Sequence, residues 1–204
     1  TKVCTYCNDT VEEDIIIDDY YTYTVHSDGV SVTLNSVNEH IGSEVVIPST
    51  VAGYTVKSVS AFRDNKNITK VTIPASVELY WSTFSGCDNL KTVIFEEGRT
   101  EIPESCLWLC ESLETVEIPE SVKVIGNSAF SGCGNLKSID LPDGLTTIGS
   151  NAFEGCSSLE NVVIPDTVTE IGTHAFYESE ALISANIPGG VKLIDAYTFS
   201  RCSS

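Results

Sequence analysis

The most reactive side chains in this sequence are those of its cysteines. The chain has 204 residues and eight cysteines. Five of them share one position of a repeating pattern: Cys87, Cys110, Cys133, Cys156 and Cys202. A sixth, Cys106, stands where other copies have alanine. Cysteines of exported proteins commonly form disulfides, but a free thiol in an apolar column packs as a small buried hydrophobe. We therefore predict six core thiols, with disulfides between neighbouring copies as the alternative.

Cys4 and Cys7 form the one C-x-x-C pair of the chain. A redox motif needs this pair at a strand-to-helix turn, and a structural zinc site needs two further ligands. The sequence around the pair offers neither, so we predict a local disulfide or two thiols in a terminal segment. A thiol enzyme that uses Cys4 and Cys7 stays an alternative.

The remaining groups that could catalyse a reaction lack partners at motif spacing. His26, His40 and His174 have no Cys or Asp partner and are expected to be solvated surface residues. The many carboxylates occupy variable positions, and no phosphate loop, nucleophile elbow or zinc-protease motif is found. We predict no catalytic residue, no metal and no cofactor.

Large aromatic residues at variable positions could bind a ligand. Trp108 and Tyr177 share the position after a phenylalanine column, and Trp81 lies in a shortened copy. Exposed aromatics are common in binding hot spots and can stack on sugars. The alternative is that these three side chains shield neighbouring copies from water.

The charge balance limits the class of partner. The chain has 29 acidic and 11 basic residues, with a formal net charge of -18. Such a chain repels nucleic acid and anionic lipid surfaces. No stretch reaches the roughly 18 apolar residues of a membrane span, so no membrane insertion is expected within this chain. With 42% hydrophobic residues, the chain can bury a substantial core.

A repeat of about 23 residues organises most of the sequence. A V-x-I-P pattern places its third position at Ile47, Ile73, Phe95, Ile118, Leu141, Ile164 and Ile187, and at Phe95 the proline is replaced by Glu96. A second column holds Phe62, Phe84, Leu107, Phe130, Phe153, Phe176 and Phe199. The unit reads L-x-x-V-x-I-P-x-x-V-x-x-I-G-x-x-A-F-x-x-C-x-x-L. Its length lies in the 20 to 29 range of leucine-rich repeats.

Each unit is expected to form one coil of a right-handed solenoid. In one copy Val93 and Phe95 alternate with Thr92 and Ile94, which predicts a short strand of a parallel sheet. Proline ends the strand, and the spacing of A-F-x-x-C-x-x-L predicts a short helical or 3₁₀ turn behind the sheet. The predicted fold class is therefore an α/β repeat solenoid. Its decisive feature is a row of piled side chains formed by Phe130, Phe153 and Phe176.

The columns I-P, I-G-x-x-A-F, G-C and L resemble the BspA-like class of bacterial leucine-rich repeats over roughly residues 41 to 204. That class occurs in surface and secreted proteins of host-associated and other bacteria. The resemblance implies adhesion or binding of host proteins, outside the cell or on its surface. The copy with Phe95 and Glu96, Leu107 and the shortened stretch from Val77 to Phe84 depart from the pattern.

The two ends of the repeat array differ from its middle. Residues 1–40 do not follow the repeat and are expected to be an N-terminal cap with an acidic lead-in. Alternation at Tyr21–Val25 and Val30–Leu34 around Ser27-Asp28-Gly29 predicts a β-hairpin there. Residues 41–204 are expected to form about seven coils. Because Ser204 comes before the strand of the last coil, we expect a longer parent protein.

The outward strand positions form the predicted recognition surface: Lys70, Thr72, Thr92, Ile94, Thr115, Glu117, Ser138, Asp140, Asn161, Val163, Ser184 and Asn186. Small polar residues are also ordinary at water-facing sheet positions, which is the structural alternative. The leading hypothesis is a non-catalytic surface or secreted scaffold that binds a protein, such as a host extracellular protein. The alternative is a carbohydrate-binding module that uses Trp81, Trp108 and Tyr177 to bind a glycan, attached to a catalytic domain outside this chain.

Overall fold

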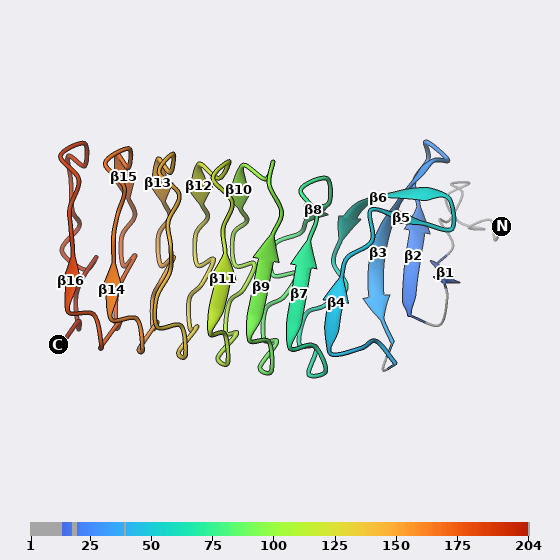
Figure 1. Ribbon diagram of the computed structural model, residues 1–204, viewed down its shortest axis with the longest axis horizontal. Coiled ribbons are helices and arrows are strands. Elements are labelled where there is room, and N and C mark those ends of the chain that lie inside the picture. The colour runs from blue at the N-terminus through green and yellow to red at the C-terminus, as the bar shows by residue number, and fades with distance from the viewer. Residues whose placement is uncertain (1–13, 18–19, 39, 204) are drawn as a thin grey trace, which may run out of the picture.

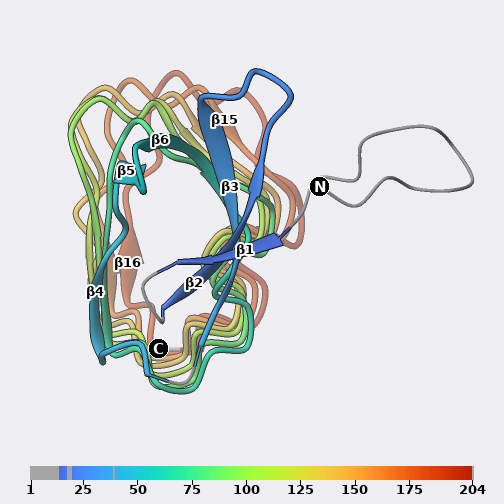
Figure 2. The same ribbon diagram turned by 90° about the vertical axis from the view of Figure 1, so that its right-hand side faces the viewer.

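The protein is a stack of coils. The computed structural model describes residues 14–17, 20–38 and 40–203. Figure 1 shows the coils side by side along the long axis, with the first strands at one end and β16 at the other. Figure 2 looks along this axis and shows successive coils superimposed, with β1 and β2 in front of them. Each coil therefore touches mainly the coil before it and the coil after it.

The strands are short. In chain order they are β1 (Asp14–Ile17), β2 (Tyr21–Val25), β3 (Ser31–Val37), β4 (Glu44–Val46), β5 (Thr50–Val51), β6 (Tyr54–Val59), β7 (Lys70–Ile73), β8 (Glu78–Leu79), β9 (Thr92–Phe95), β10 (Glu101–Ile102), β11 (Thr115–Glu117), β12 (Val124–Ile125), β13 (Thr147–Ile148), β14 (Asn161–Val162), β15 (Glu170–Ile171) and β16 (Ser184–Ala185).

One wall of the solenoid is a parallel sheet, which we call the face sheet. It contains β4, β7, β9 and β11, and the parallel pair β14 and β16 continues its row in Figure 1. The strands pair without a shift, so Lys70 lies opposite Thr92 and Thr92 opposite Thr115. Equivalent positions of the repeat therefore form straight columns.

The predicted alternation along each strand is confirmed. In β9, Val93 and Phe95 are buried, whereas Thr92 and Ile94 are partly exposed. Residues at every second position of a strand point to the same side, so one set faces the core and the other faces solvent.

A second parallel sheet, which the sequence reasoning missed, forms another wall. It contains β10, β12, β13 and β15 and comes from the V-x-x-I-G part of the repeat. Each strand has two residues, of which the isoleucine is buried, as at Ile125 and Ile148. Strands this short show no alternating pattern in the sequence, so only their repetition could have indicated them.

The predicted helical or 3₁₀ turns are wrong. The segments around the Phe column, which we call the turn column, are consecutive β-turns, and the described residues contain no helix. In the segments between the first and the last, two positions adopt a left-handed backbone, as at Ser128 (φ 53°) and Gly132 (φ 77°). A right-handed helix needs negative φ at every residue, so this alternation interrupts it. In the described ranges the fold is a β-solenoid, and none of it is a helix able to cross a membrane.

Hydrogen bonds along the turn column join the coils. Within one segment, Ser131 N donates to Ser128 O (3.2 Å), which closes a turn. The intervening amides donate to the next coil, as Phe130 N does to Ala152 O (2.9 Å) and Gly132 N to Glu154 O (2.7 Å). The backbone thus satisfies its polar groups through neighbouring coils, as the strands do.

The predicted row of phenylalanines is confirmed. The ring centroids of Phe130 and Phe153 are 5.3 Å apart, as are those of Phe153 and Phe176, with planes inclined by 6° and 9°. Phe199 continues the row at 5.2 Å from Phe176. One buried apolar cluster extends through all coils.

An antiparallel hairpin of β2 and β3 lies at the N-terminal end of the stack. β1 extends it on one side, and on the other β3 runs parallel to β6 of the first coil. Asp28 fixes the hairpin turn by accepting hydrogen bonds from Val30 N, Ser31 N and Ser31 Oγ, and these hold its pKa at about 2, well below the ordinary value. The division into a cap (1–40) and a solenoid (41–204) stays a prediction.

Candidate functional site

The residues predicted as a recognition surface occupy the outward positions of the face sheet and the loop between its two parts. Side chains on β7 and β9 (Lys70, Thr72, Thr92 and Ile94) are partly exposed. Those farther along are exposed: Thr115, Glu117, Ser138, Asp140, Asn161, Val163, Ser184 and Asn186. Ser138 and Asn161 form a parallel bridge, which aligns the loop with β14.

Two kinds of side chain interrupt this polar surface: exposed apolar ones, and polar ones that are already hydrogen-bonded within the protein. Val46 and Val163 are 67% and 74% exposed, respectively. The side-chain amide of Asn186 is hydrogen-bonded to the backbone of the preceding coil. It accepts a hydrogen bond from Ile164 N and donates one to Ile164 O, both at 2.8 Å. Ser184 Oγ donates to Asn161 Oδ1 (3.0 Å). Three of the predicted residues, Asn161, Ser184 and Asn186, are thus held by hydrogen bonds to one another or to the backbone.

The three aromatic residues predicted as an alternative site lie in separate places. Trp81 is 69% exposed and Trp108 is 39% exposed, in successive coils. Tyr177 lies three coils beyond Trp108, under the guanidinium of Arg201 at 5.4 Å. No ring contact joins any two of the three in the part of the chain that the structure describes.

The prediction that all histidines are solvated surface residues is wrong for two of them. His26 is partly buried, with Nδ1 2.9 Å from Ser31 Oγ and Nε2 2.8 Å from Thr33 Oγ1. His174 is stacked on Tyr197, with ring centroids 4.9 Å apart. No sequence motif indicates these contacts, because the partners of His26 belong to a facing strand and Tyr197 belongs to the next coil. His40 is exposed.

A hollow of about 540 Å³ lies between the hairpin and the first two coils. We call it the junction hollow. Its lining residues are Thr24, His26, Thr33, Asn35, Ser60, Arg63, Tyr80, Trp81 and Ser82. Of these, sequence reasoning singled out Trp81 as a binding residue and missed the others. Tyr80 and Trp81 could have been noticed because they replace the usual Gly-x of the repeat.

The six repeat cysteines are free thiols, as predicted. In the column of Cys133, each Sγ donates to the carbonyl of the Phe-column residue one coil earlier, as Cys133 does to Leu107 O (3.3 Å). Ser179 fills the same role with its hydroxyl, 2.9 Å from Phe153 O. Burial raises the pKa of Cys156 and Cys106 to about 12. A thiol that stays protonated is a poor nucleophile, so the column is structural.

Arg99 is an anomaly in the core. It takes the place that Val77, Val122 and Leu145 hold in other coils, and it is only 7% exposed. Its Nη2 donates to Pro74 O (3.0 Å) and Val77 O (2.6 Å), whereas Nε has no hydrogen-bond partner. Burial lowers the pKa of the guanidinium. Without a carboxylate partner, the cation must recover its desolvation cost from these two carbonyls and from the Phe95 ring, whose centroid lies 5.7 Å from Cζ.

Metal and thiol chemistry find no support in the described ranges. They hold no group of three or more His, Cys, Asp or Glu side chains placed to bind a metal ion. The predicted C-x-x-C pair, Cys4 and Cys7, lies outside the described residues.

Several solved structures resemble this chain. A leucine-rich repeat protein from Bacteroides ovatus is 31% identical over 93% of this chain and 45% of its own, with a TM-score of 0.68. The pneumococcal vaccine antigen PcpA is 27% identical over 89% of this chain and 51% of its own, with a TM-score of 0.72. A T. pallidum leucine-rich repeat protein is 27% identical over 87% of this chain and 73% of its own, with a TM-score of 0.53.

This chain spans about half the length of the first and second of these proteins. No curated protein matches it. The model of the BspA type leucine-rich repeat region, with six copies, matches residues 56–182 and 123–204. These ranges hold the face sheet from β7 onward, the second sheet and most of the turn column, so the family accounts for the repeat as a whole. The chain belongs to the BspA-type leucine-rich repeat family.

Proposed function

We propose that this chain is a non-catalytic scaffold, secreted or held at a bacterial cell surface, that binds a protein ligand through the face sheet. The observation that supports this most directly is the straight, solvent-facing columns of that sheet. Residues such as Thr115, Glu117 and Asp140 are exposed on a rigid base of buried side chains. A fixed base lowers the entropy lost when a partner binds.

The composition of the face sheet fits a protein partner. Polar side chains alternate with exposed apolar ones, such as Val46 and Val163, and this mixture is typical of protein interfaces. The family resemblance supports a more specific role, in which the chain mediates adhesion and its ligand is a host extracellular protein. The pneumococcal relative is named as a vaccine antigen, which agrees with exposure outside the cell.

The chemistry of the cysteines and the charge of the chain support the same proposal. The raised pKa of buried thiols such as Cys156 makes them poor nucleophiles. The net charge of -18 opposes binding to nucleic acid and to anionic lipids. A non-catalytic role that depends on surface contacts is consistent with both features.

The test uses the full chain and a panel of purified host plasma and extracellular-matrix proteins, measured by biolayer interferometry. The double variant Glu117→Arg/Asp140→Arg reverses two charges on the face sheet. We expect it to weaken binding of the captured protein about tenfold or more, because like and unlike charges at an interface determine affinity and partner choice. Thermal unfolding checks that the fold is retained.

A matched control reverses the same charges on the other wall. Glu101→Arg/Glu170→Arg changes two exposed residues of the second sheet and gives the same net charge. This control is expected to bind within about twofold of the unmodified chain. If no protein in the panel binds, or if both double variants behave alike, the proposal is wrong.

A further inference from the structure

The junction hollow combines groups from three segments that are far apart in the sequence. The hairpin contributes Thr24, His26, Thr33 and Asn35, the first coil contributes Ser60 and Arg63, and the second contributes Tyr80, Trp81 and Ser82. Its volume of about 540 Å³ lies within the ~300–1,000 Å³ of small-molecule sites. The hollow lies away from the outward side of the face sheet and plays no part in the function proposed above.

Beside the hollow, a bulky side chain stands where the regular coils have glycine. A Cβ added at Gly126 would lie 2.7 Å from Glu104 N of the preceding coil, and one at Gly172 would lie 2.3 Å from Ser150 N. Tyr80 holds this place of the repeat in the second coil. The second coil therefore carries a bulky side chain at a place where the regular coils pack backbone against backbone.

The hairpin side of the hollow is a fixed polar surface. His26 Nε2 lies 2.8 Å from Thr33 Oγ1, which in turn lies 2.7 Å from the buried Ser58 Oγ. Asn35 Nδ2 donates to Thr24 Oγ1 (2.6 Å). Because these side chains hold one another in place, the polar wall of the hollow is rigid, and a ligand would lose little entropy in ordering it.

The coil side of the hollow is aromatic and open to solvent. Trp81 is 69% exposed and Tyr80 is 50% exposed. Aromatic rings offer a flat apolar face, and tyrosine and tryptophan add a polar group at the edge. A saccharide ring matches this pair of surfaces, because its C–H face can cover an aromatic ring while its hydroxyls bind polar side chains.

The charge of the hollow is opposite to that of the chain. Its lining includes the cation Arg63 and the imidazole of His26 but no Asp or Glu, although acidic residues number 29 in the whole chain. Arg63 makes only a long contact with a carboxylate, its Nε being 3.7 Å from Asp64 Oδ2. A guanidinium binds a carboxylate through two parallel hydrogen bonds. We propose that the junction hollow binds a saccharide that carries a carboxylate, such as a uronic or sialic acid residue, with Trp81 against the ring and Arg63 on the carboxylate.

The first experiment titrates the full chain with oligosaccharides by isothermal calorimetry. The probes are a glucuronic acid oligosaccharide, a sialylated oligosaccharide, and the same two compounds with the carboxyl group reduced to an alcohol. We expect at least one acidic probe to bind, and its reduced form to bind about tenfold or more weakly, since a charge-assisted pair is lost. If neither acidic probe binds by about 10 mM, or if acid and alcohol bind equally, the proposal is overturned.

Variants then locate the site. Trp81→Ala should weaken both the acidic probe and its reduced form about tenfold, whereas Arg63→Gln should weaken the acidic probe alone. Trp108→Ala and Arg201→Gln are matched controls outside the hollow and should change affinity less than about twofold. All four residues are partly or fully exposed, so thermal unfolding should show intact folds. A loss on Trp108→Ala equal to that on Trp81→Ala would refute the site.

The two tests are independent. Glu117→Arg/Asp140→Arg on the face sheet should leave saccharide binding unchanged, whereas Trp81→Ala should leave protein binding unchanged. Failure of one proposal is therefore distinguishable from failure of the other.

Discussion

The regular coils, residues 119–187, and the irregular coils before them, residues 54–118, are built from the same unit but pack differently. In the regular coils, Gly126, Gly149 and Gly172 let successive backbones touch, and the phenylalanine rings are nearly parallel, at 6° and 9°. In the first two coils, the stacked rings of Phe62 and Phe84 are inclined by 23°. In the second coil Tyr80 replaces the glycine, and in the third coil the buried Arg99 replaces the apolar residue of its column.

This difference indicates how a repeat protein gains a specific site. Regular coils present the same few groups over and over, so they suit an extended surface. A shallow pocket needs groups that differ from their neighbours, and it forms where one coil departs from the pattern and meets a non-repeating hairpin. Residues that bind a small ligand are therefore best sought where a column is broken, and residues that bind an extended partner are best sought on the unbroken columns.

Removing a ring from the middle of the row should have the largest effect on stability. Phe153 is fully buried and stacked on both sides, whereas Phe62 is stacked on Phe84 alone. Phe153→Ala should lower the free energy of unfolding by about 3–5 kcal/mol, measured by urea denaturation. Phe62→Ala should cost about 1 kcal/mol less, because one ring pair fewer is lost. Equal losses would mean that ring stacking does not distinguish the two regions.

Adding one carbon between regular coils should have the next largest effect. A Cβ at Gly149 would lie 2.7 Å from Asn127 N, so the coils must separate. Gly149→Ala should therefore cost about 1–3 kcal/mol. Tyr80→Ala, at the same place of an irregular coil, should change stability by no more than about 0.5 kcal/mol, because its side chain is largely exposed. A tolerated Gly149→Ala would contradict the close contact.

Restoring the apolar column should stabilise the irregular coil. Arg99→Leu removes a buried cation whose Nε has no partner, and should raise the free energy of unfolding by about 1 kcal/mol, although two hydrogen bonds to carbonyls are lost. The thermal midpoint measures this change. Arg63→Leu, on the surface, is the control and should stay within about 0.5 kcal/mol. A destabilised Arg99→Leu would show that the two carbonyl contacts outweigh the cost of burial.

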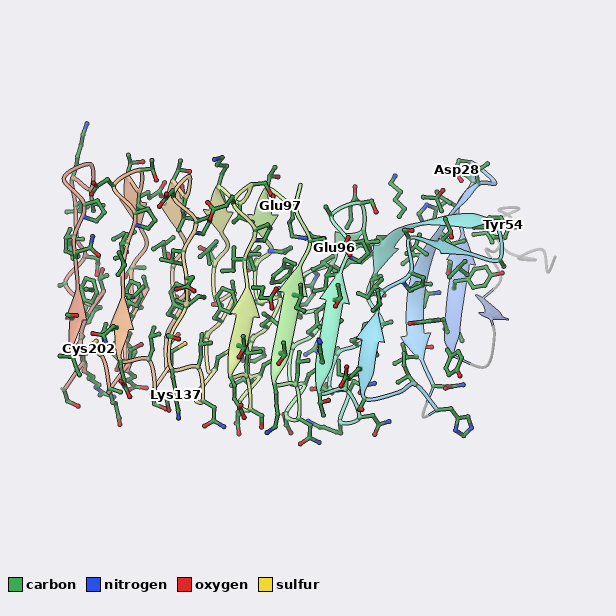
Figure 3. All side chains as sticks on the ribbon, in the orientation of Figure 1. Asp28, Tyr54, Glu96, Glu97, Lys137 and Cys202 are labelled. Carbon is green, nitrogen blue, oxygen red and sulfur yellow. The ribbon has the colours of Figure 1, made fainter. Side chains whose placement is uncertain are left out.

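Alkaline pH should destabilise the regular coils through their thiols, with a smaller effect. Burial raises the pKa of Cys156 from its ordinary value of 9.0 to about 12. Below pH 9 the thiol is protonated in both states; between about pH 9 and 12 only the unfolded thiol ionises, so stability falls as pH rises. Cys156→Ser should reduce this loss of stability at high pH. The serine hydroxyl keeps the hydrogen-bond donor, as Ser179 does naturally. Cys202→Ser, at the more exposed C-terminal end of the stack (Figure 3), should reduce the loss less.

Periodicity made the core predictable from the sequence. Residues at equal repeat positions must lie over one another if the coils stack, so the row from Phe130 to Phe176 and the buried Val93 and Phe95 were both predicted and confirmed. The cysteine column followed from the same reasoning, because a repeated position is a packing position.

Backbone conformation and contacts between unlike segments could not be predicted. The spacing of A-F-x-x-C-x-x-L fits both a helical turn and consecutive β-turns. Serine and histidine rarely adopt a left-handed backbone, so the residue types at Ser128 and His174 do not predict it. The junction hollow depends on His26 and Asn35 lying beside Trp81. The hairpin does not share the repeat pattern of the coils, so the sequence does not show that these residues are neighbours. Eight of the twelve predicted recognition residues lie on strands of the face sheet, and the role of this face in binding stays a prediction.

The hydrogen bonds that run from each turn segment to the next coil determine how the molecule would respond to force. Because the interactions of a coil are mainly with its two neighbours, pulling the ends apart should peel coils one after another instead of rupturing the whole domain at once. Each coil released would add about 23 residues of chain, or roughly 75 Å of extended length. For the surface scaffold proposed above, such stepwise lengthening would absorb a pull before the contact with the ligand breaks.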